Sequence, residues 1–486
     1  MTGPVVVVGD TLLDRDIDGV VARLCPDAPA PVLDERASVD RPGGAGLAAL
    51  LAAGQGADVA LVTALSEDVG GARLSQLLTA AGVQLYALSL PGATPEKIRL
   101  RSGGQVLLRL DRGGAAEACG EPGGAVLDLL AEAGAILVSD YGRGVARSPA
   151  LRAALAATRA PIVWDPHPRG PEAVPGVRLA TPNEAEVRQL AGVTGEDSRL
   201  AIAARGAQEL RQRWRSGAVA VTLGCEGALL CHAGATPLVI PSPTKADGDT
   251  CGAGDQFAAA VAVALSRGAL VSEAVQEAVG QAAAYVADGG AAYLPNRAVA
   301  DGPKAAQNRP TVPGGPARRP DEAWIGARQA AALVRRIRAE GGTVVATGGC
   351  FDLLHAGHVA TLQAARRLGD CLVVCLNSDS SVTGLKGSDR PLVPQPDRCR
   401  LLAALGCVDA VVVFDEPTPQ AVLSWLRPDI WVKGGDYGTG GGDEPDLPEA
   451  RVVRRWGGHT VVVPYLDGRS TTRMIATVRS GAGSRG

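Results

Sequence analysis

An eleven-residue stretch, Gly348 to His358, constrains the fold of this chain more than any other segment. It reads Gly-Gly-Cys-Phe-Asp-Leu-Leu-His-Ala-Gly-His and follows an apolar run, Thr343 to Ala346, which predicts a buried strand. After it, apolar side chains recur on one face of a predicted helix: Val359, Leu362, Ala365 and Leu368. Two histidines therefore lie where a strand turns into a helix. The first N–H groups of a helix are unpaired and its dipole is positive there, so this place favours a phosphate group.

His355 and His358 can donate hydrogen bonds at this helix start and hold a triphosphate. One alternative is a zinc pair at positions i and i+3, but no further Cys or His cluster with ligand spacing lies nearby. Another alternative is that both histidines are simply structural. Two of the five histidines of the chain fall in this one turn, which favours a functional role.

The stretch resembles the Gly-x-Phe-Asp-x-x-His-x-Gly-His motif of the cytidylyltransferase-like nucleotidyltransferases, and the resemblance continues to the C-terminus. A second predicted strand, Leu372 to Leu376, ends at Asn377-Ser378-Asp379, and residues 470–472 open a predicted last helix. The resemblance implies a Rossmann-like domain whose catalytic residues are His355, His358 and Lys386. The implied nucleotide and phosphate contacts are Gly349, Phe351, Asp352, Arg390, Lys433, Gly434, Ser470, Thr471 and Thr472.

Charge and composition argue against several classes of protein. The formal net charge is −3, so no overall positive field favours binding to nucleic acid. The sequence enters a strand, Val5 to Val8, without the pattern of a signal peptide, and no apolar run reaches membrane-spanning length. Ten cysteines are scattered without a Cys-x-x-Cys pair, which is typical of reduced thiols in the cytosol. We therefore expect a cytoplasmic protein with no nucleic-acid or membrane partner.

The domain organisation follows from alternating strand-like and helix-like segments, which predict an α/β architecture with mostly parallel sheets. The segment Val299 to Pro320 is rich in Pro, Gly, Ala and Arg and has no apolar periodicity, so we interpret it as a linker. A helix from Glu322 to Ala339 is expected to follow it. The predicted parts are two domains, 1–300 and 322–480, a linker, 301–321, and a disordered tail, 481–486.

The N-terminal part contains a second loop that suits phosphate, Asp-Thr-Cys-Gly-Ala-Gly-Asp at residues 249–255, before a predicted helix from Gln256 to Ser266. Gly252 and Gly254 remove side chains where the helix begins, so successive N–H groups can surround a phosphoryl group in transfer. Asp255 then lies beside this anion hole, where it can take a proton from an attacking hydroxyl. The alternative is a glycine-rich loop that an Asp merely caps.

Two further N-terminal segments can face a sugar. In Val-Val-Gly-Asp-Thr-Leu-Leu-Asp, residues 7–14, Gly9 permits a tight exit from the strand, and Asp10 and Asp14 can bind hydroxyl groups. Residues 42–46, Pro-Gly-Gly-Ala-Gly, open a helix where bare backbone can approach a ligand. An Asp at a strand end is more often a cap or turn residue, so neither segment is decisive alone.

Together these segments resemble the ribokinase-like (PfkB) carbohydrate kinases over about residues 4–295. The resemblance implies a β lid over the sugar at residues 97–111 and a general base at Asp255. The implied anion hole is Gly252, Ala253 and Gly254. The implied sugar and sugar-phosphate contacts are Asp10, Asp14, Gly43, Gly44, Lys97, Arg99 and Arg109.

On the nucleotide side, the same resemblance implies contacts by Thr222 and Gly224. Asn183 and Glu186 belong to an Asn-x-x-Glu pattern that the family links to Mg²⁺ and phosphate positioning. ATP is the implied co-substrate, and Mg²⁺ is expected to bind with ATP rather than at a direct protein site.

One stretch narrows the expected substrate. Residues 23–32, Arg-Leu-Cys-Pro-Asp-Ala-Pro-Ala-Pro-Val, resemble the Arg-x-x-Pro-Glu-Ala-Pro-x-Pro-Val run of heptose-7-phosphate kinases. Ser139-Asp140-Tyr141 and Asp165-Pro166 also match that subfamily. With the second domain in this order, nearly the whole chain resembles the bifunctional heptose-7-phosphate kinase / heptose-1-phosphate adenylyltransferase family.

That resemblance implies two reactions. ATP phosphorylates D-glycero-D-manno-heptose 7-phosphate at C1, and a second ATP gives its adenylyl group to heptose 1-phosphate, which yields ADP-heptose and pyrophosphate. The 1,7-bisphosphate must lose its 7-phosphate between these steps. Neither predicted domain carries a phosphatase motif, so a separate phosphatase is an implied partner. We also expect a homodimer.

Four positions depart from the family pattern: Leu47, Arg143, His167 and Gln281. Leu47 stands where the family has an Asn that touches the sugar, and a leucine cannot replace the hydrogen bonds of an amide. A buried sugar site that loses a hydrogen-bond partner binds more weakly. We therefore expect an active kinase with a raised KM for the heptose phosphate.

Three alternatives stay open. The second domain could be a CTP-using cytidylyltransferase that acts on an alditol or amino-alcohol phosphate, because the histidine motif does not reveal the base. The first domain could be an inactive kinase that only scaffolds the transferase. The whole chain could be a nucleotide-binding regulatory module, although Asp255 and the two histidines argue against that function.

Overall fold

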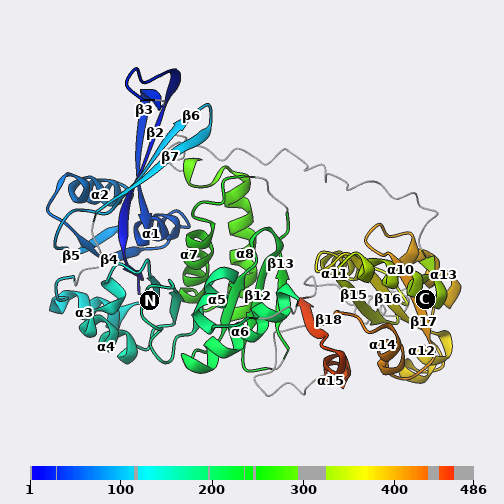
Figure 1. The fold of residues 1–486 in the computed structure, drawn as a ribbon. Helices are drawn as coiled ribbons and strands as arrows, with labels where there is room; N and C mark the ends of the chain where they lie inside the picture. Colours follow the sequence, from blue (N-terminus) through cyan, green and yellow to red (C-terminus); the bar gives the residue numbers. More distant parts are fainter. Residues whose placement is uncertain are drawn as a thin grey trace, which may run out of the picture. The chain divides into compact units, whose positions relative to one another are not determined.

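The computed structural model describes residues 3–28, 30–113, 119–194, 198–234, 236–244, 248–293, 324–435 and 448–464. They form two compact units, one built mainly from residues before 302 and the other mainly from residues after it (Figure 1). The predicted linker and tail lie outside the described residues, so the proposed domain boundaries stay a prediction.

The first unit contains an eight-strand sheet whose order is β12-β11-β10-β9-β8-β1-β4-β5. All neighbours are parallel except the last pair at one edge, β11 and β12. The strands are β1 (Val5–Gly9), β4 (Val59–Leu65), β5 (Gln84–Ser89), β8 (Ala135–Ser139), β9 (Ile162–Asp165), β10 (Leu179–Ala180), β11 (Val219–Thr222) and β12 (Gly227–Cys231). β1, β4 and β8 are buried along their whole length, as expected for parallel strands covered on both faces.

Helices alternate with these strands, as the sequence predicts. They are α1 (Ala45–Ala53), α2 (Val69–Ala80), α3 (Gly124–Glu132), α4 (Pro149–Ala157), α5 (Glu184–Ala191), α6 (Arg199–Arg213), α7 (Ala253–Ser266) and α8 (Val271–Ala287). Short 3₁₀ turns (Val145–Arg147, Gly224–Glu226, Gly290–Tyr293) complete the elements of this unit, whereas β13 (Leu238–Pro241) groups with the second unit. α7 packs against α1, α8 and β8, and every residue from Asp255 to Leu265 is buried. Its many alanines let these neighbours approach closely.

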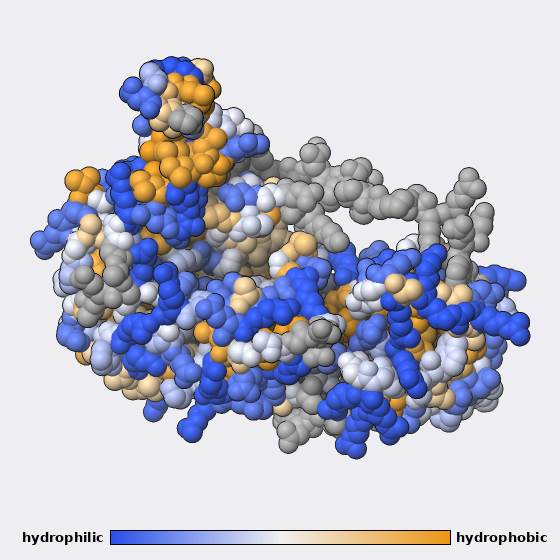
Figure 2. Space-filling model, in the orientation of Figure 1, coloured by the Kyte–Doolittle hydropathy of each residue, from blue (hydrophilic) through white to orange (hydrophobic). Residues whose placement is uncertain are grey.

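A separate four-stranded sheet forms the predicted β lid and extends beyond the helices of the first unit (Figure 1). Its order is β3 (Pro31–Gly44), β2 (Thr11–Leu24), β6 (Glu96–Ser102) and β7 (Gln105–Arg112). β7 is an edge strand whose residues are all exposed, and its apolar side chains include Val106, Leu107, Leu108 and Leu110. Figure 2 shows apolar residues gathered on this lid.

The second unit is a parallel sheet of order β14-β17-β16-β15-β18-β19, which confirms the Rossmann-like prediction. Its strands are β14 (Trp324–Ile325), β15 (Val344–Gly349), β16 (Cys371–Asn377), β17 (Ala410–Phe414), β18 (Ile430–Gly435) and β19 (His459–Pro464). Its helices are α10 (Ala327–Ala339), α11 (Ala356–Arg366), α12 (Asp379–Lys386), α13 (Gln395–Ala403), α14 (Gln420–Leu426) and α15 (Pro448–Val453), with a 3₁₀ turn at Arg454–Trp456.

Several predicted boundaries were wrong by a few residues. The helix predicted from residue 322 begins at Ala327, because Trp324 and Ile325 pair with β17 as a short strand. The helix predicted from residue 256 begins at Ala253. Of the predicted apolar face of α11, Leu362, Ala365 and Leu368 are buried, although Leu368 lies beyond the helix end, and Val359 is only half-buried.

Gly9 also has a different structural role from the predicted tight exit of the strand. It is the last residue of β1, and a Cβ there would lie 1.9 Å from the Ser139 carbonyl oxygen of β8. The glycine therefore permits two strands to approach closely.

Among the helices of the described ranges, none combines the length and the apolar character that crossing a bilayer would require.

Candidate active sites

The loop before α7 forms the predicted anion hole of the first unit. Gly252 is the N-cap of α7 with φ of 82°, a left-handed conformation that favours glycine. A Cβ at Gly252 would also lie 2.7 Å from the Tyr285 hydroxyl and 2.8 Å from Leu47 Cδ2. Gly254 faces open space. The Ala253 N–H donates to the Thr250 carbonyl oxygen at 3.1 Å, whereas the N–H groups of Gly252 and Gly254 can reach a phosphoryl group.

Asp255 lies in the first turn of α7 and is 6% exposed. Burial raises the pKa of its carboxyl to about 7, and Asp14 adds to the increase, against the hydrogen bond from Tyr141 and the charge of Lys97. A base whose pKa lies near neutral pH is suited to accept a proton from a sugar hydroxyl. The position and the raised pKa of Asp255 suit the role of a base, which stays a prediction.

The predicted sugar contacts come together where the lid meets α7. Arg99 Nη1 is 3.0 Å from Asp14 Oδ1, and Lys97 Nζ lies 5.3 Å from the centre of the Tyr141 ring. Gly43 leaves room for Asp14, because a Cβ there would be 2.6 Å from its Oδ2. Burial lowers the pKa of Lys97. These side chains form a compact site with charges of both signs.

Two predicted sugar residues have other partners in the structure. Arg109 lies on exposed β7 opposite Arg99, and its guanidinium forms a 2.8 Å ion pair with Asp111. Asp10 is buried and its carboxylate accepts three backbone hydrogen bonds, from Tyr141 (3.1 Å), Arg143 (2.8 Å) and Val145 (3.0 Å). Asp10 therefore anchors the loop that follows β8, and a sugar contact by either residue stays a prediction.

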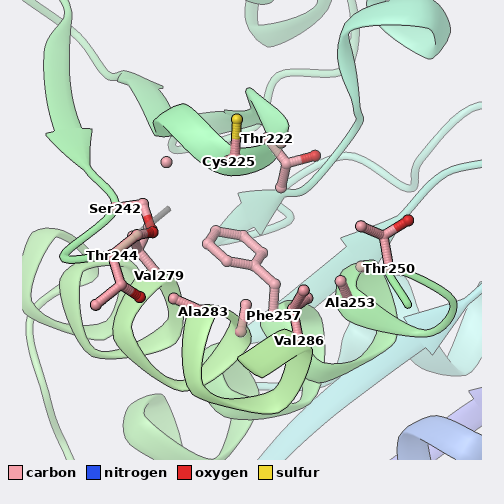
Figure 3. Close-up of a pocket in the computed structure, with 14 residues that line it drawn as sticks. Thr222, Cys225, Ser242, Thr244, Thr250, Ala253, Phe257, Val279, Ala283 and Val286 are labelled. Atoms are coloured by element: carbon pink, nitrogen blue, oxygen red, sulfur yellow. The ribbon is translucent and has the colours of Figure 1, made fainter. Parts of the chain in front are cut away.

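A cavity of about 150 Å³ opens beside the anion hole (Figure 3). Its lining includes four predicted residues, Thr222, Gly224, Ala253 and Gly254. The prediction missed the apolar wall, which consists of Phe257, Val279, Ala282, Ala283 and Val286. Figure 3 shows the Phe257 ring reaching from α7 toward Thr222 and Cys225. An apolar cavity of this kind suits the flat base of a nucleotide.

Asn183 and Glu186 form a capping box at the start of α5. The Asn183 N–H donates to Glu186 Oε2 (2.8 Å), and the Glu186 N–H donates to Asn183 Oδ1 (3.0 Å). Asn183 also pairs with Thr222 at the end of β11. Burial raises the pKa of Glu186. The capping box fixes both side chains next to the end of β11. The Glu186 carboxylate has two oxygens, so it can still accept a hydrogen bond from water on Mg²⁺.

In the second unit, the two histidines begin α11 as predicted. His355 is the N-cap, and its Nδ1 accepts a hydrogen bond from the Gly357 N–H at 3.1 Å. The two imidazole rings stack with centres 3.9 Å apart. Burial, followed by repulsion from His355 and Lys386, lowers the pKa of His358 to about 4. His358 is therefore neutral at neutral pH and can act as a hydrogen-bond donor without carrying charge.

A cavity of about 190 Å³ lies in front of this helix start. It brings together seven predicted residues, namely Gly349, Phe351, Asp352, His358, Lys386, Arg390 and Gly434. Lys433 does not line it, and its Nζ is instead 2.8 Å from Glu449 Oε1. The predicted contacts Ser470, Thr471 and Thr472 lie outside the described residues.

Asp352 holds the loop that carries Arg390. Its carboxylate accepts hydrogen bonds from the Arg390 side chain and from the N–H groups of Leu392 (2.6 Å) and Val393 (2.9 Å). Burial opposes ionisation, but these hydrogen bonds outweigh it, so the pKa of Asp352 is lowered. Asp352 thus positions the Arg390 guanidinium at the cavity. Direct contact between Asp352 and a nucleotide stays a prediction.

Arg398 was not among the predicted site residues. It is fully buried and donates to the carbonyl oxygens of Val393 (2.9 Å), Cys350 (2.6 Å) and Asn377 (2.8 Å), and to Asp379 Oδ1 (2.7 Å). These bonds connect the loop before α11 with the end of β16, the start of α12 and the loop before α13. Sequence spacing gives no sign of such a network, because its partners are far apart in the chain.

Comparison with known proteins gives a consistent picture for both units. The pfkB family carbohydrate kinase model matches residues 3–297, and the cytidylyltransferase-like model matches residues 346–462. The bifunctional protein HldE of Streptomyces coelicolor is 53% identical over 482 residues, covering 99% of this chain and 97% of the relative. The bifunctional protein HldE of Azorhizobium caulinodans is 37% identical, covering 98% of each chain. The solved structure of Arabidopsis thaliana ribokinase with ribose and ATP is 22% identical with a TM-score of 0.48, covering 59% of this chain and 93% of the ribokinase.

Proposed function

This chain belongs to the family of bifunctional HldE proteins, and we propose that it performs two transfers from ATP in the synthesis of ADP-heptose. The first unit phosphorylates D-glycero-D-manno-heptose 7-phosphate at C1, which gives the 1,7-bisphosphate. The second unit transfers the adenylyl group of ATP to heptose 1-phosphate, which gives ADP-heptose and pyrophosphate. The observation that carries the proposal is Asp255, a buried base with a pKa of about 7 directly after the anion-hole loop.

In the kinase step, Asp255 accepts the proton of the C1 hydroxyl as the C1 oxygen attacks the γ-phosphorus. The anion hole is the backbone of Gly252, Ala253 and Gly254, where the N–H groups of the two glycines stabilise the charge on the transferring group. Asp14, held by Arg99, accepts a hydrogen bond from a sugar hydroxyl, and Lys97 balances the negative charge beside Asp255. Asn183 and Glu186 at the start of α5 would hold the Mg²⁺ that enters with ATP, and that ion would supply positive charge to the phosphates.

The transferase step needs no base, because the attacking group is already a phosphate anion. The sugar phosphate attacks the α-phosphorus in line, and pyrophosphate leaves. Neutral His358 donates a hydrogen bond to phosphate oxygens, while Lys386 and Arg390 supply positive charge around the cavity. Catalysis then rests on positioning and charge stabilisation.

The pathway and assembly follow from the same proposal. A separate phosphatase removes the 7-phosphate between the two steps, both of which take place in the cytoplasm. The chain acts as a homodimer, which is supported by the apolar side chains that β7 exposes along the lid edge. The two catalytic domains are residues 1–300 and 322–480. Separate expression of residues 1–302 and 320–486, followed by an activity assay of each piece, tests this division.

Product analysis tests the proposed function directly. The chain is incubated with heptose 7-phosphate and ATP, with and without an added heptose bisphosphate phosphatase, and the products are identified by mass spectrometry. We expect the 1,7-bisphosphate without the phosphatase and ADP-heptose with it. Absence of the bisphosphate would indicate an inactive, scaffolding kinase unit. A faster reaction with CTP than with ATP would support a cytidylyltransferase.

A further inference from the structure

Tyr141 occupies the space directly beside the reacting carboxylate of the kinase site. Its hydroxyl oxygen is 2.9 Å from each carboxylate oxygen of Asp255, although the two residues are 114 positions apart in the chain. An ionised carboxylate can only accept, so the phenol donates this hydrogen bond. The bond connects the loop after β8 with the first turn of α7.

The Tyr141 ring is held in this place on several sides. Lys97 Nζ lies 5.3 Å from the ring centre, and the ring of His167 stacks on it at 6.5 Å. Gly44 packs beside the ring, because a Cβ there would lie in ordinary contact, 3.4 Å, with Tyr141 Cδ2 and only 2.4 Å from the Asp10 carbonyl oxygen. The Tyr141 N–H donates to Asp10 Oδ2 at 3.1 Å, which fixes the backbone. The hydroxyl is therefore aimed at Asp255 by the fold and not by chance rotation of an exposed side chain.

The groups that face Asp255 come from four other elements. They are Asp14 on β2, Lys97 on β6, Asp165 on β9 and Tyr285 on α8, in addition to Tyr141. Burial raises the pKa of Asp255 and Asp14 raises it further, whereas the Tyr141 hydrogen bond and then Lys97 lower it. The pKa of Asp165 is raised well above its usual range, first by burial and then by the charges of Glu186 and Asp255.

We propose that Tyr141 is a positioning residue for the kinase reaction, a role that rests on the proposed function: its hydroxyl orients the Asp255 carboxylate and keeps it ionised for the incoming sugar hydroxyl. A carboxylate offers about four lone-pair sites, so Tyr141 leaves room for that hydroxyl on either oxygen. In the step, the proton of the C1 hydroxyl passes to Asp255, and the C1 oxygen forms its bond to the γ-phosphorus. The bond from that phosphorus to ADP breaks, and its electron pair leaves with ADP.

Tyr141 keeps its own proton throughout this step. Burial, followed by the charge of Asp255, raises the pKa of its phenol well above the usual range. The phenol is therefore a lasting donor and cannot compete with Asp255 as the base. This separates its role from that of a catalytic acid or base.

Tyr141→Phe in the full-length chain tests the role, because it removes the hydroxyl and keeps the ring. Two measurements are made: the pH dependence of kinase kcat/KM, and the titration of Asp255 by NMR of ¹³C-labelled aspartate, assigned through Asp255→Asn. We expect both the acid limb and the Asp255 titration to move about one pH unit upward, since a hydrogen bond to a charged group is lost. Tyr86→Phe is the matched control. It removes a phenol on β5, outside the groups that face Asp255, and its acid limb should stay at the wild-type pH.

A Tyr141→Phe chain whose Asp255 titration and acid limb both stay at the wild-type pH would overturn the proposal, whatever its kcat. If this variant fails to fold, replacement of tyrosine by 3-fluorotyrosine gives a second test. The fluorinated phenol is a stronger donor, so the Asp255 titration should move downward, and an unchanged titration would reject the role. Because the NMR titration needs no turnover, it stays informative if the wild-type chain shows no heptose-phosphate phosphorylation, a result that would reject the proposed function itself.

Discussion

The two candidate sites both bury a titratable side chain at a helix start, with opposite results. In the first unit, burial raises the pKa of Asp255 to about 7 and makes it a stronger base. In the second unit, burial lowers the pKa of His358 to about 4 and removes its charge. The proposed reactions account for the difference. A sugar hydroxyl must lose a proton to become a nucleophile. A sugar phosphate attacks as an anion, so it needs no base, and a neutral donor such as His358 holds phosphate oxygens less tightly than a charged one.

The largest expected effect comes from removing the base on one side of this comparison. Asp255→Asn keeps the shape of the side chain and abolishes proton acceptance, so kinase kcat should fall by ~10²–10⁴-fold. Adenylyl transfer by the same protein should be unchanged, and Asp128→Asn on the exposed surface of α3 is the matched control. Near-normal phosphorylation by Asp255→Asn would exclude Asp255 as the base.

The converse change removes the neutral donor from the other site. His358→Ala should reduce adenylyl transfer by ~10²–10³-fold, since a preorganised hydrogen bond to the phosphate group is lost. Pyrophosphate release reports this rate, and the kinase rate of the same protein serves as the internal control. A transferase that loses less than about tenfold would mean that His355 and Lys386 alone carry the charge stabilisation.

A smaller effect is expected at Leu47, where the kinase site departs from its family. Leu47 is 3% exposed and its Cδ2 lies against Gly252 of the anion hole. Leu47→Asn should lower KM for the heptose phosphate by up to ~10-fold, if one hydrogen bond of about 1–1.5 kcal/mol is restored. The KM for ATP should not change. Weaker sugar binding in the variant would show that the leucine is needed to pack the anion-hole loop.

The smallest expected effect is the pH dependence of the wild-type kinase activity, which distinguishes the two sites without any mutation. Only the ionised form of Asp255 accepts a proton, so kinase kcat/KM should decrease as pH falls through about 7. Between pH 8 and 6.5 the expected decrease is roughly fourfold for a single group of that pKa. His358, with a pKa of about 4, stays neutral over this range, so it contributes no such decrease to adenylyl transfer. Parallel pH profiles of the two activities would contradict the assignment of opposite roles.

The sequence predicted best what short segments determine by themselves. Gly252 and Asp255 lie within one loop and one helical turn, and the two histidines lie within another, at the helix starts that the motifs predict, while their roles stay predictions. Tyr141 and the apolar wall of the nucleotide cavity were missed, because they reach the site through contacts between distant segments. Asp10 was noticed as a carboxylate at a strand end, and Asp352 was noticed through the resemblance of the histidine motif. Their partners turned out to include the backbone of neighbouring loops, which periodicity does not reveal.

The alanine-rich centre of α7 restricts how this enzyme can change in evolution. Ala259, Ala262 and their neighbours are fully buried against α1, α8 and the sheet, so a larger side chain there would push the helix outward. Asp255 stands on the first turn of the same helix and would move with it. Because a displacement of about 1 Å can cost ~10²-fold in rate, such a change would slow phosphorylation before it unfolds the domain. Natural variation at these positions should therefore be narrow even though none of the alanines touches a substrate.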